Sequence, residues 1–258
     1  MSYFTKTFKP DIIDGDISKV IASNADDAPF ADGDILFDWH AVDIPLGTNA
    51  IVDGVVHMFG EDGAAQVSDD FTLLIAKSKD GAAPTTLGEE NAAITGCFEL
   101  PEVLMNVMTF EGTTNRAGTL ALGFGSVWHF NSPGAGGHVA PIVIEPEHNA
   151  LGGTTTNRIY VAGIAGGAFD FSTGVLANAG VSDDAATTIV TKTVDLRKAF
   201  RPGDVVYIHD VDTAIGTVSS LTDNDLTLTA NNVGAISTND ELMNATPITV
   251  TLSFSTGK

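Results

Sequence analysis

Apolar and polar residues alternate in short runs along most of the chain. In the run at residues 247–254, the polar residues between the apolar ones are threonine and serine. An extended strand points successive side chains to opposite faces, so this run predicts a strand with one apolar face. The residues on that face are Ile248, Val250, Leu252 and Phe254. Such a strand requires a partner sheet with an apolar face of its own.

Similar runs recur earlier in the chain, separated by glycine, aspartate, asparagine and proline, which favour turns. They predict strands at residues 35–44, 50–59, 71–78, 103–110, 119–130, 139–145 and 158–164. Helical periodicity is nearly absent. Short helices are predicted only at residues 196–200 and 237–244, the second because Thr238 and Glu241 have the spacing of a capping box. The 27 glycines and 10 prolines also favour an all-β chain with many turns.

The strand pattern changes after residue 170. Residues 171–188 are small and polar and predict a loop, whereas residues 188–245 contain short strands joined by turns rich in Asp and Asn. We expect the final strand to return to the first set of strands. The fold class predicted is all-β: a jelly-roll-like β-sandwich (residues 30–187 plus 246–258) with a small β-barrel or meander module (residues 188–245) inserted before the last strand.

Residues 1–29 form a separate N-terminal arm in this prediction. Tyr3, Phe4 and Phe8 place aromatic rings on an otherwise polar segment. Two alternatives are open for it. The aromatic rings bind a partner, or the arm lies across its own sandwich.

Acidic residues outnumber basic ones, 33 to 12, which gives a net charge of −21. This balance argues against nucleic acid as a direct partner, because phosphate binding requires clustered Lys and Arg. Four of the basic residues nevertheless fall within ten positions: Lys192, Arg197, Lys198 and Arg201. This basic cluster is either a solvated turn or a docking patch for an acidic neighbouring surface.

Cys97 is the single cysteine, so the chain has no internal disulfide, and we expect its thiol to pack as a small hydrophobic group. The first residues lack the apolar core of a signal peptide, and no uninterrupted apolar run approaches 18 residues. We therefore expect a protein that is made in the cytoplasm and does not span a membrane.

A search for catalytic chemistry gives no strong candidate. The glycine-rich stretches at 123–128 and 134–139 lack the spacing of phosphate-binding loops, and no two histidines have the spacing of a local zinc motif. Residues 145–149 combine two glutamates with His148, but we expect a solvent-facing polar loop there. The Asp-rich turns at 11–16, 26–34 and 209–213 do not fit the calcium-loop pattern, which leaves calcium as the lesser alternative to ordinary turns. We predict no catalytic residue, no metal and no cofactor.

Two stretches, residues 37–66 and 200–254, resemble virion structural proteins of tailed marine phages, particularly those that infect cyanobacteria. The shared features are an F-D-W opening strand, an I-P-x-G-T turn, an apolar strand ending near G-x-D-G, a P-G-D-x-V-Y element and a closing P-I-x-x-x-L-x-F strand. The resemblance covers about half of the chain and brings no catalytic residue with it. It implies a β-sandwich that decorates or cements a phage capsid, with the major capsid protein and further copies of itself as partners. A tail or fibre location is the lesser alternative.

We expect a homotrimer, in which neighbours cover the sandwich edges. Three other functions remain open. A host-attachment or carbohydrate-binding module would expose Trp39, Trp128 and Tyr160 in a groove, although their alternation with core positions predicts burial. An extracellular filament subunit would use residues 1–29 as a donor strand for the next copy. A glycosidase would require a pair of carboxylates whose separation is set by the fold.

Overall fold

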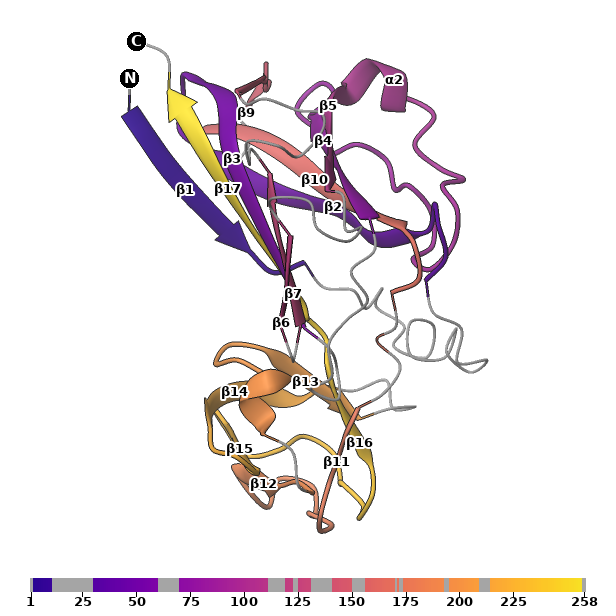
Figure 1. The fold of residues 1–258 in the computed structure, drawn as a ribbon, viewed down its shortest axis with the longest axis vertical. Coiled ribbons are helices and arrows are strands. Elements are labelled where there is room, and N and C mark those ends of the chain that lie inside the picture. The colour runs from indigo at the N-terminus through magenta and orange to yellow at the C-terminus, as the bar shows by residue number, and fades with distance from the viewer. Residues whose placement is uncertain are drawn as a thin grey trace.

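The fold is nearly all β, with a larger sandwich and a smaller module joined end to end (Figure 1). It is known from a computed structural model, which describes residues 2–10, 30–59, 70–110, 119–122, 125–130, 141–149, 156–169, 171, 174–192, 195–208 and 214–256. This architecture agrees with the all-β class that the alternating pattern predicts.

Two antiparallel sheets build the sandwich. The first has the strand order β1-β17-β3-β7-β6, with β8 paired to β3, and the second has the order β2-β10-β4-β5, with β9 paired to β10. The strands of the first sheet are β1 (Ser2–Phe8), β3 (Thr48–Phe59), β6 (Thr119–Leu122), β7 (Gly125–Phe130), β8 (Ile142–Val143) and β17 (Ile248–Thr256). Those of the second are β2 (Ile35–Ile44), β4 (Asp70–Lys77), β5 (Leu104–Phe110), β9 (His148–Asn149) and β10 (Thr156–Gly166). A single helical turn, α2 (Leu100–Val103), precedes β5.

The chain crosses repeatedly from one sheet to the other, since β1, β2, β3 and β4 alternate between the two. Such crossings are typical of jelly-roll-like sandwiches, and here they bring apolar faces of both sheets into one core. Its largest fully buried side chains are aromatic and include Phe37, Phe71 and Phe254. The prediction of an all-β sandwich is confirmed.

Strand β17 completes the first sheet of the sandwich. It pairs with β3 from Ile248 to Thr256 and with β1 on its other side. The four apolar side chains of the alternating run are fully buried, and the threonines between them are half-exposed on the outer face. The predicted return of the last strand to the sandwich is therefore confirmed, and the small module is an insertion.

Strand β1 forms the edge of the same sheet. All seven of its residues pair with β17, from Ser2 opposite Thr256 to Phe8 opposite Val250. Phe4 stacks on the buried ring of Phe254 at a centroid distance of 5.1 Å. Two alternatives were open for the N-terminal arm. In the structure, residues 2–8 lie on their own sandwich. Residues 11–29 of that arm lie outside the described residues.

The small module is one antiparallel sheet of order β11-β16-β13-β14-β15-β12, which curls around a core of its own. Its strands are β11 (Val175–Leu176), β12 (Thr188–Val190), β13 (Val205–Ile208), β14 (Ala214–Leu221), β15 (Asp225–Leu228) and β16 (Glu241–Asn244), with the 3-10 turn η2 (Leu196–Lys198) before β13. This turn falls within the short helix predicted at residues 196–200. The sheet begins at β11, earlier than the expected boundary at residue 188, because the two residues of β11 pair with β16.

The helix predicted at residues 237–244 is wrong. Residues 237–240 form a turn in which Asp240 Oδ2 accepts a hydrogen bond from the Ser237 amide, at 2.6 Å, and Asn239 has a φ of 74°. The next four residues are strand β16, paired with β11 and β13. Leu242 is fully buried in the core of the module, so tertiary packing outweighs the local capping signal.

The module packs against the end of the sandwich. Met243 and Ala245 are buried in the core cluster of the sandwich, and Val205 and Tyr207 pack against it. The two parts therefore share apolar surface, which a module of this size requires to supplement its own small core.

Candidate functional site

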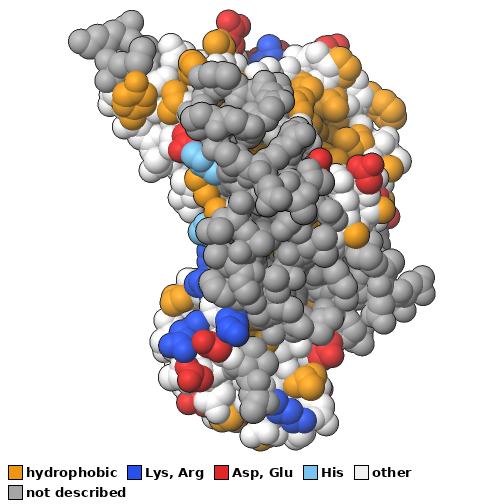
Figure 2. Space-filling view, viewed as in Figure 1, with side chains coloured by type: hydrophobic (Ala, Val, Ile, Leu, Met, Phe, Trp, Pro, Cys, Tyr) orange, Lys and Arg blue, Asp and Glu red, His pale blue; other side chains and the backbone are white. Residues whose placement is uncertain are grey.

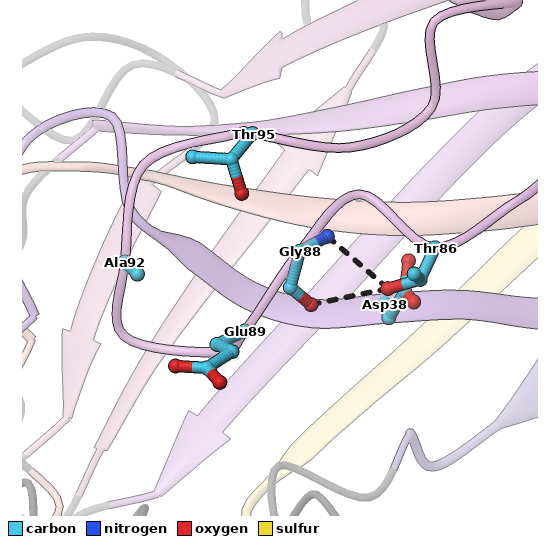
Figure 3. Close-up of a pocket in the computed structure, with 6 residues that line it drawn as sticks. All are labelled: Asp38, Thr86, Gly88, Glu89, Ala92 and Thr95. Atoms are coloured by element: carbon cyan, nitrogen blue, oxygen red, sulfur yellow. Dashed lines mark hydrogen bonds between the residues drawn. The ribbon is translucent and has the colours of Figure 1, made fainter.

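A recess lies beside β2, where the connection from β4 to α2 (residues 78–99) folds back over the edge of the second sheet. Its volume is about 710 Å³ and it is open to solvent. Two arms of the connection run across β2, and the recess lies between them (Figure 3). Its lining combines two carboxylates and two hydroxyls with two small residues: Asp38, Glu89, Thr86, Thr95, Gly88 and Ala92.

A β-bulge in β2 directs side chains toward this connection. Two residues of β2, Asp38 and Trp39, lie opposite the single residue Ala162 of β10. Bulges bend a strand and re-aim its side chains, and they are common beside binding sites. Gly163 accommodates the bend, since a Cβ there would lie 2.3 Å from a ring carbon of Phe37.

Both bulged residues hold the connection by hydrogen bonds. The Leu87 amide donates to Asp38 Oδ1 at 3.1 Å, and Trp39 Nε1 donates to the Thr85 carbonyl at 2.9 Å. Farther along, Glu99 Oε1 accepts from both the amide and the hydroxyl of Thr85, each at 2.7 Å. These two hydrogen bonds hold the pKa of Glu99 below its usual value. The connection is therefore fixed at several points.

The two arms of the connection are in backbone contact. The amides of Thr95 and Gly96 both donate to the Leu87 carbonyl, at 3.0 and 2.6 Å. Gly88 has a φ of +142°, a conformation that favours glycine. A Cβ on Gly96 would lie 2.3 Å from the Thr86 carbonyl oxygen, so only glycine fits between the arms. The width of the recess thus depends on this contact.

Replacement of Gly96 by alanine is expected to separate the arms. The contact is with backbone, which cannot rotate away, so overpacking should destabilise the protein by about 1–3 kcal/mol. The measurement is urea unfolding together with the amide chemical shifts of residues 86–96. Gly33→Ala is the control for the loss of a glycine: no atom lies within 4 Å of the added Cβ, although its φ of +92° brings some strain. Unchanged amide shifts in Gly96→Ala would contradict the close contact.

Cys97, near the end of the connection, is buried in the same apolar cluster as Leu87. Burial raises the pKa of its thiol. A thiol with a raised pKa is a poor nucleophile. The structure thus agrees with the predicted role of Cys97 as a small hydrophobic group.

A second polar cluster lies where the module meets the sandwich, around the carboxylate of Asp204. This side chain is only 1% exposed. Its Oδ1 pairs with Lys9 Nζ, which follows β1, while its Oδ2 accepts from the Arg201 amide at 2.7 Å and from Asn244 Nδ2 at 2.8 Å. One carboxylate thus joins the N-terminal strand of the sandwich to two segments of the module.

The predicted basic cluster is partly neutralised within the chain. Arg197 makes two hydrogen bonds to Asp195, at 2.7 and 3.0 Å, and a third to Asp223 at 2.5 Å. Arg201 is half-buried, and its guanidinium donates to the Phe200 carbonyl at 2.7 Å. Lys198 is exposed and makes no ion pair with any described residue. Figure 2 shows Lys and Arg side chains gathered on the module beside acidic ones, which is the arrangement of a solvated turn.

The three aromatic residues predicted for interaction differ in exposure. Tyr3 is 63% exposed on the outer face of β1. Phe4 and Phe8 are half-buried, and the ring of Phe8 stacks on His40 of the second sheet at a centroid distance of 4.6 Å. Only Tyr3 therefore offers its ring to a partner.

The aromatic residues expected to line a glycan groove are buried or half-buried where the structure describes their side chains. Tyr160 is 5% exposed, as the alternation predicted, and Trp39 is half-buried with its indole hydrogen-bonded to the chain. The side chain of Trp128 lies outside the described residues. Because Tyr160 is buried, its ring is not available to line a carbohydrate groove.

The candidate metal positions give no site in the described part of the chain. Glu147 is tied to its own fold, since it accepts from Ser78 Oγ at 2.7 Å and from the Gly81 amide at 3.2 Å. Among the described residues, no group of three or more His, Cys, Asp or Glu could hold a metal ion. The segments 11–16, 26–29, 134–139 and 209–213 and the side chain of His148 lie outside these residues.

Two half-buried histidines predict a loss of stability in mild acid. Burial lowers the pKa of His40 and His57 below 6.5, and the charge of Arg201 further lowers that of His57. Between the folded and unfolded pKa values, the unfolded chain therefore binds more protons than the folded chain does. The contribution of these histidines to the free energy of unfolding is fully present above about pH 6.5 and is lost as the pH falls through the folded pKa values. Urea midpoints measured from about pH 7 to about pH 5 should decrease, and they should decrease less in His40→Gln/His57→Gln. An identical profile in that variant would contradict the assignment.

The sequence matches no protein-family model, no curated protein and no solved structure. None of the described helices is long and apolar enough to cross a membrane.

Proposed function

We propose that the chain is a non-enzymatic structural subunit of a virion, which decorates or cements a phage capsid through contacts with copies of itself and with the capsid surface. The observation that carries the proposal is the exposed edge of the sandwich at β1. Strand β1 is the first strand of its sheet and pairs on one side only, with β17, among the described strands.

An edge strand of seven residues presents unpaired backbone groups to a neighbouring chain, and such edges are common sites of association. The pattern of side chains on β1 fits this role. Phe4 and Phe8 fix the strand to its own sandwich, while Tyr3 extends an aromatic ring into solvent on the outer face. Tyrosine is enriched at interfaces because its ring supplies contact area and its hydroxyl a hydrogen bond.

The outer face next to β1 adds a broad polar surface. Thr7 and Thr251 are hydrogen-bonded through their hydroxyls at 2.9 Å, and His129 lies 2.7 Å from Asp53 on the neighbouring strands. These side chains are half-exposed or exposed. An exposed sheet face of this kind can contribute to the area of about 1,000 Å² or more that a stable contact requires. The resemblance of residues 37–66 and 200–254 to phage virion proteins supports the choice of a capsid as the proposed setting.

The proposal is tested on virions of a phage whose genome encodes this chain, purified from an infected host culture. Quantitative mass spectrometry should find the chain in many copies per particle, and gold-labelled antibody should mark the outer surface of the head. Light scattering of the purified protein should give a mass of three times 26.8 kDa for the expected homotrimer. Absence of the chain from intact virions would refute the proposal, whereas a monomeric mass would refute only the trimer.

A further inference from the structure

We propose that the recess between the two arms of residues 78–99 binds a neutral saccharide unit. This inference is independent of the virion role, because it rests on the chemistry of the lining side chains. The lining of the recess includes neither Trp39 nor Tyr160.

The lining offers hydrogen-bond acceptors and donors together. Asp38 Oδ1 is occupied by the Leu87 amide, but no described residue donates to its Oδ2. Similarly, no described residue hydrogen-bonds the hydroxyl of Thr95, which points toward the arm that carries Gly88 (Figure 3). A carboxylate accepts and a threonine hydroxyl both donates and accepts. Sugar hydroxyls, which also do both, match this combination.

The same lining disfavours charged ligands. It contains no Lys, Arg or His, so a phosphate, sulfate or acidic sugar would find no positive charge and would be repelled by the carboxylates of Asp38 and Glu89. An ammonium group would gain little in an open recess, since solvent-exposed ion pairs contribute weakly. It would also leave the donor capacity of Thr95 unused. A neutral ligand with several hydroxyls can hydrogen-bond to more of the lining groups than an anion or an ammonium group can.

The recess is already shaped for a ligand. Three features hold both arms in place. They are the bulge at Asp38 and Trp39, the two amides that donate to the Leu87 carbonyl, and the close approach of Gly96 to Thr86. Small residues, Gly88 and Ala92, leave space and an apolar surface for the C–H face of a sugar ring. A long connection without regular structure that is nonetheless fixed in this way is usually a functional loop. Preorganisation of this kind reduces the ordering cost of binding.

The volume of about 710 Å³ falls within the range of small-molecule sites and admits a monosaccharide or disaccharide. Because the recess is open to solvent, we expect weak binding, with a dissociation constant of about 1 mM. This affinity is sufficient where many copies act together on one surface.

The test is a titration of the isotope-labelled full chain with glucose, galactose, mannose, N-acetylglucosamine, maltose and lactose, followed by amide chemical shifts. At least one sugar should shift the amides of Gly88, Ala92 and Thr95 in a saturable manner below about 100 mM. Glucuronic acid should shift them less than glucose does. No shift with any of these sugars, or shifts confined to amides elsewhere, would overturn the proposal.

Two conservative variants connect binding to the recess. Asp38→Asn keeps the acceptor for the Leu87 amide but loses the charge, and should weaken binding about tenfold. Asp43→Asn, on the same strand but outside the recess, is its control. Thr95→Val removes one hydroxyl and should weaken binding several-fold, with Thr109→Val as control. Equal binding by Asp38→Asn and Thr95→Val, both with otherwise unchanged spectra, would also overturn the proposal.

Discussion

Replacement of Asp204 by alanine is expected to lower the free energy of unfolding by about 3–5 kcal/mol, because it leaves several groups without their common acceptor. The Asn244 amide group and the Arg201 amide would lose their hydrogen bonds in a nearly water-free place. Lys9, whose side chain is 29% exposed, would lose its ion-pair partner. The substitution should also weaken the attachment of the module, since Asp204 joins it to the segment after β1.

Urea unfolding followed by tryptophan fluorescence and by circular dichroism measures this effect. The matched control is Asp223→Ala, which removes one of the two carboxylates bound to Arg197 at a site where the Asp223 side chain is 78% exposed. An exposed pair of this kind contributes about 0–1 kcal/mol. If the two variants lost the same small amount of stability, Asp204 would not be the structural link that its contacts indicate.

Replacement of Phe254 by alanine is expected to lower the free energy of unfolding by about 3–5 kcal/mol, the same range as for Asp204→Ala. The ring is fully buried between the two sheets and stacks on Phe4 of β1. Its loss leaves a cavity in the core and removes the aromatic contact that holds the edge strand. The amides of β1 should consequently exchange with solvent faster than those of the other strands.

Hydrogen exchange measured by mass spectrometry reports on β1, and urea unfolding reports on the whole chain. Tyr3→Ala is the control within the same strand, because this ring is 63% exposed and its removal should change stability by less than about 0.5 kcal/mol. Phe4→Ala should fall between the two, since Phe4 is half-buried. Normal exchange of β1 in Phe254→Ala would show that the stacked pair does not hold the strand.

The strands of the sandwich were predictable because their side chains obey a period of two. In β17 the alternation alone identified which residues enter the core, and the need for an apolar partner face placed the strand in the sandwich. The module was also predictable as a separate set of short strands. Its boundary was not, because β11 is only two residues long and carries no periodic signal. The strand β16 was mistaken for a helix because a capping-box spacing also occurs in turns.

The recess was beyond the reach of sequence patterns. Asp38 is one of three polar residues of β2, with His40 and Asp43, and only the extra residue in the pairing with β10 turns its carboxylate toward the connection. Register shifts depend on both strands together and leave no local signature. The length of the connection, residues 78–99, was the one available signal, since loops of this size are uncommon in compact domains. Two partners of Asp204, Lys9 and Asn244, come from distant segments, so their meeting is a product of the tertiary fold.

The attachment of the module through β11 and β16 has a practical consequence. These neighbouring antiparallel strands carry the chain out of the sandwich and back again, with Val175 opposite Leu242. A foreign domain whose own ends lie close together could therefore be spliced between them while β10 and β17 keep their places. If the chain covers a particle in many copies, such a graft would display the new domain as a dense regular array, suited to vaccines or immobilised enzymes.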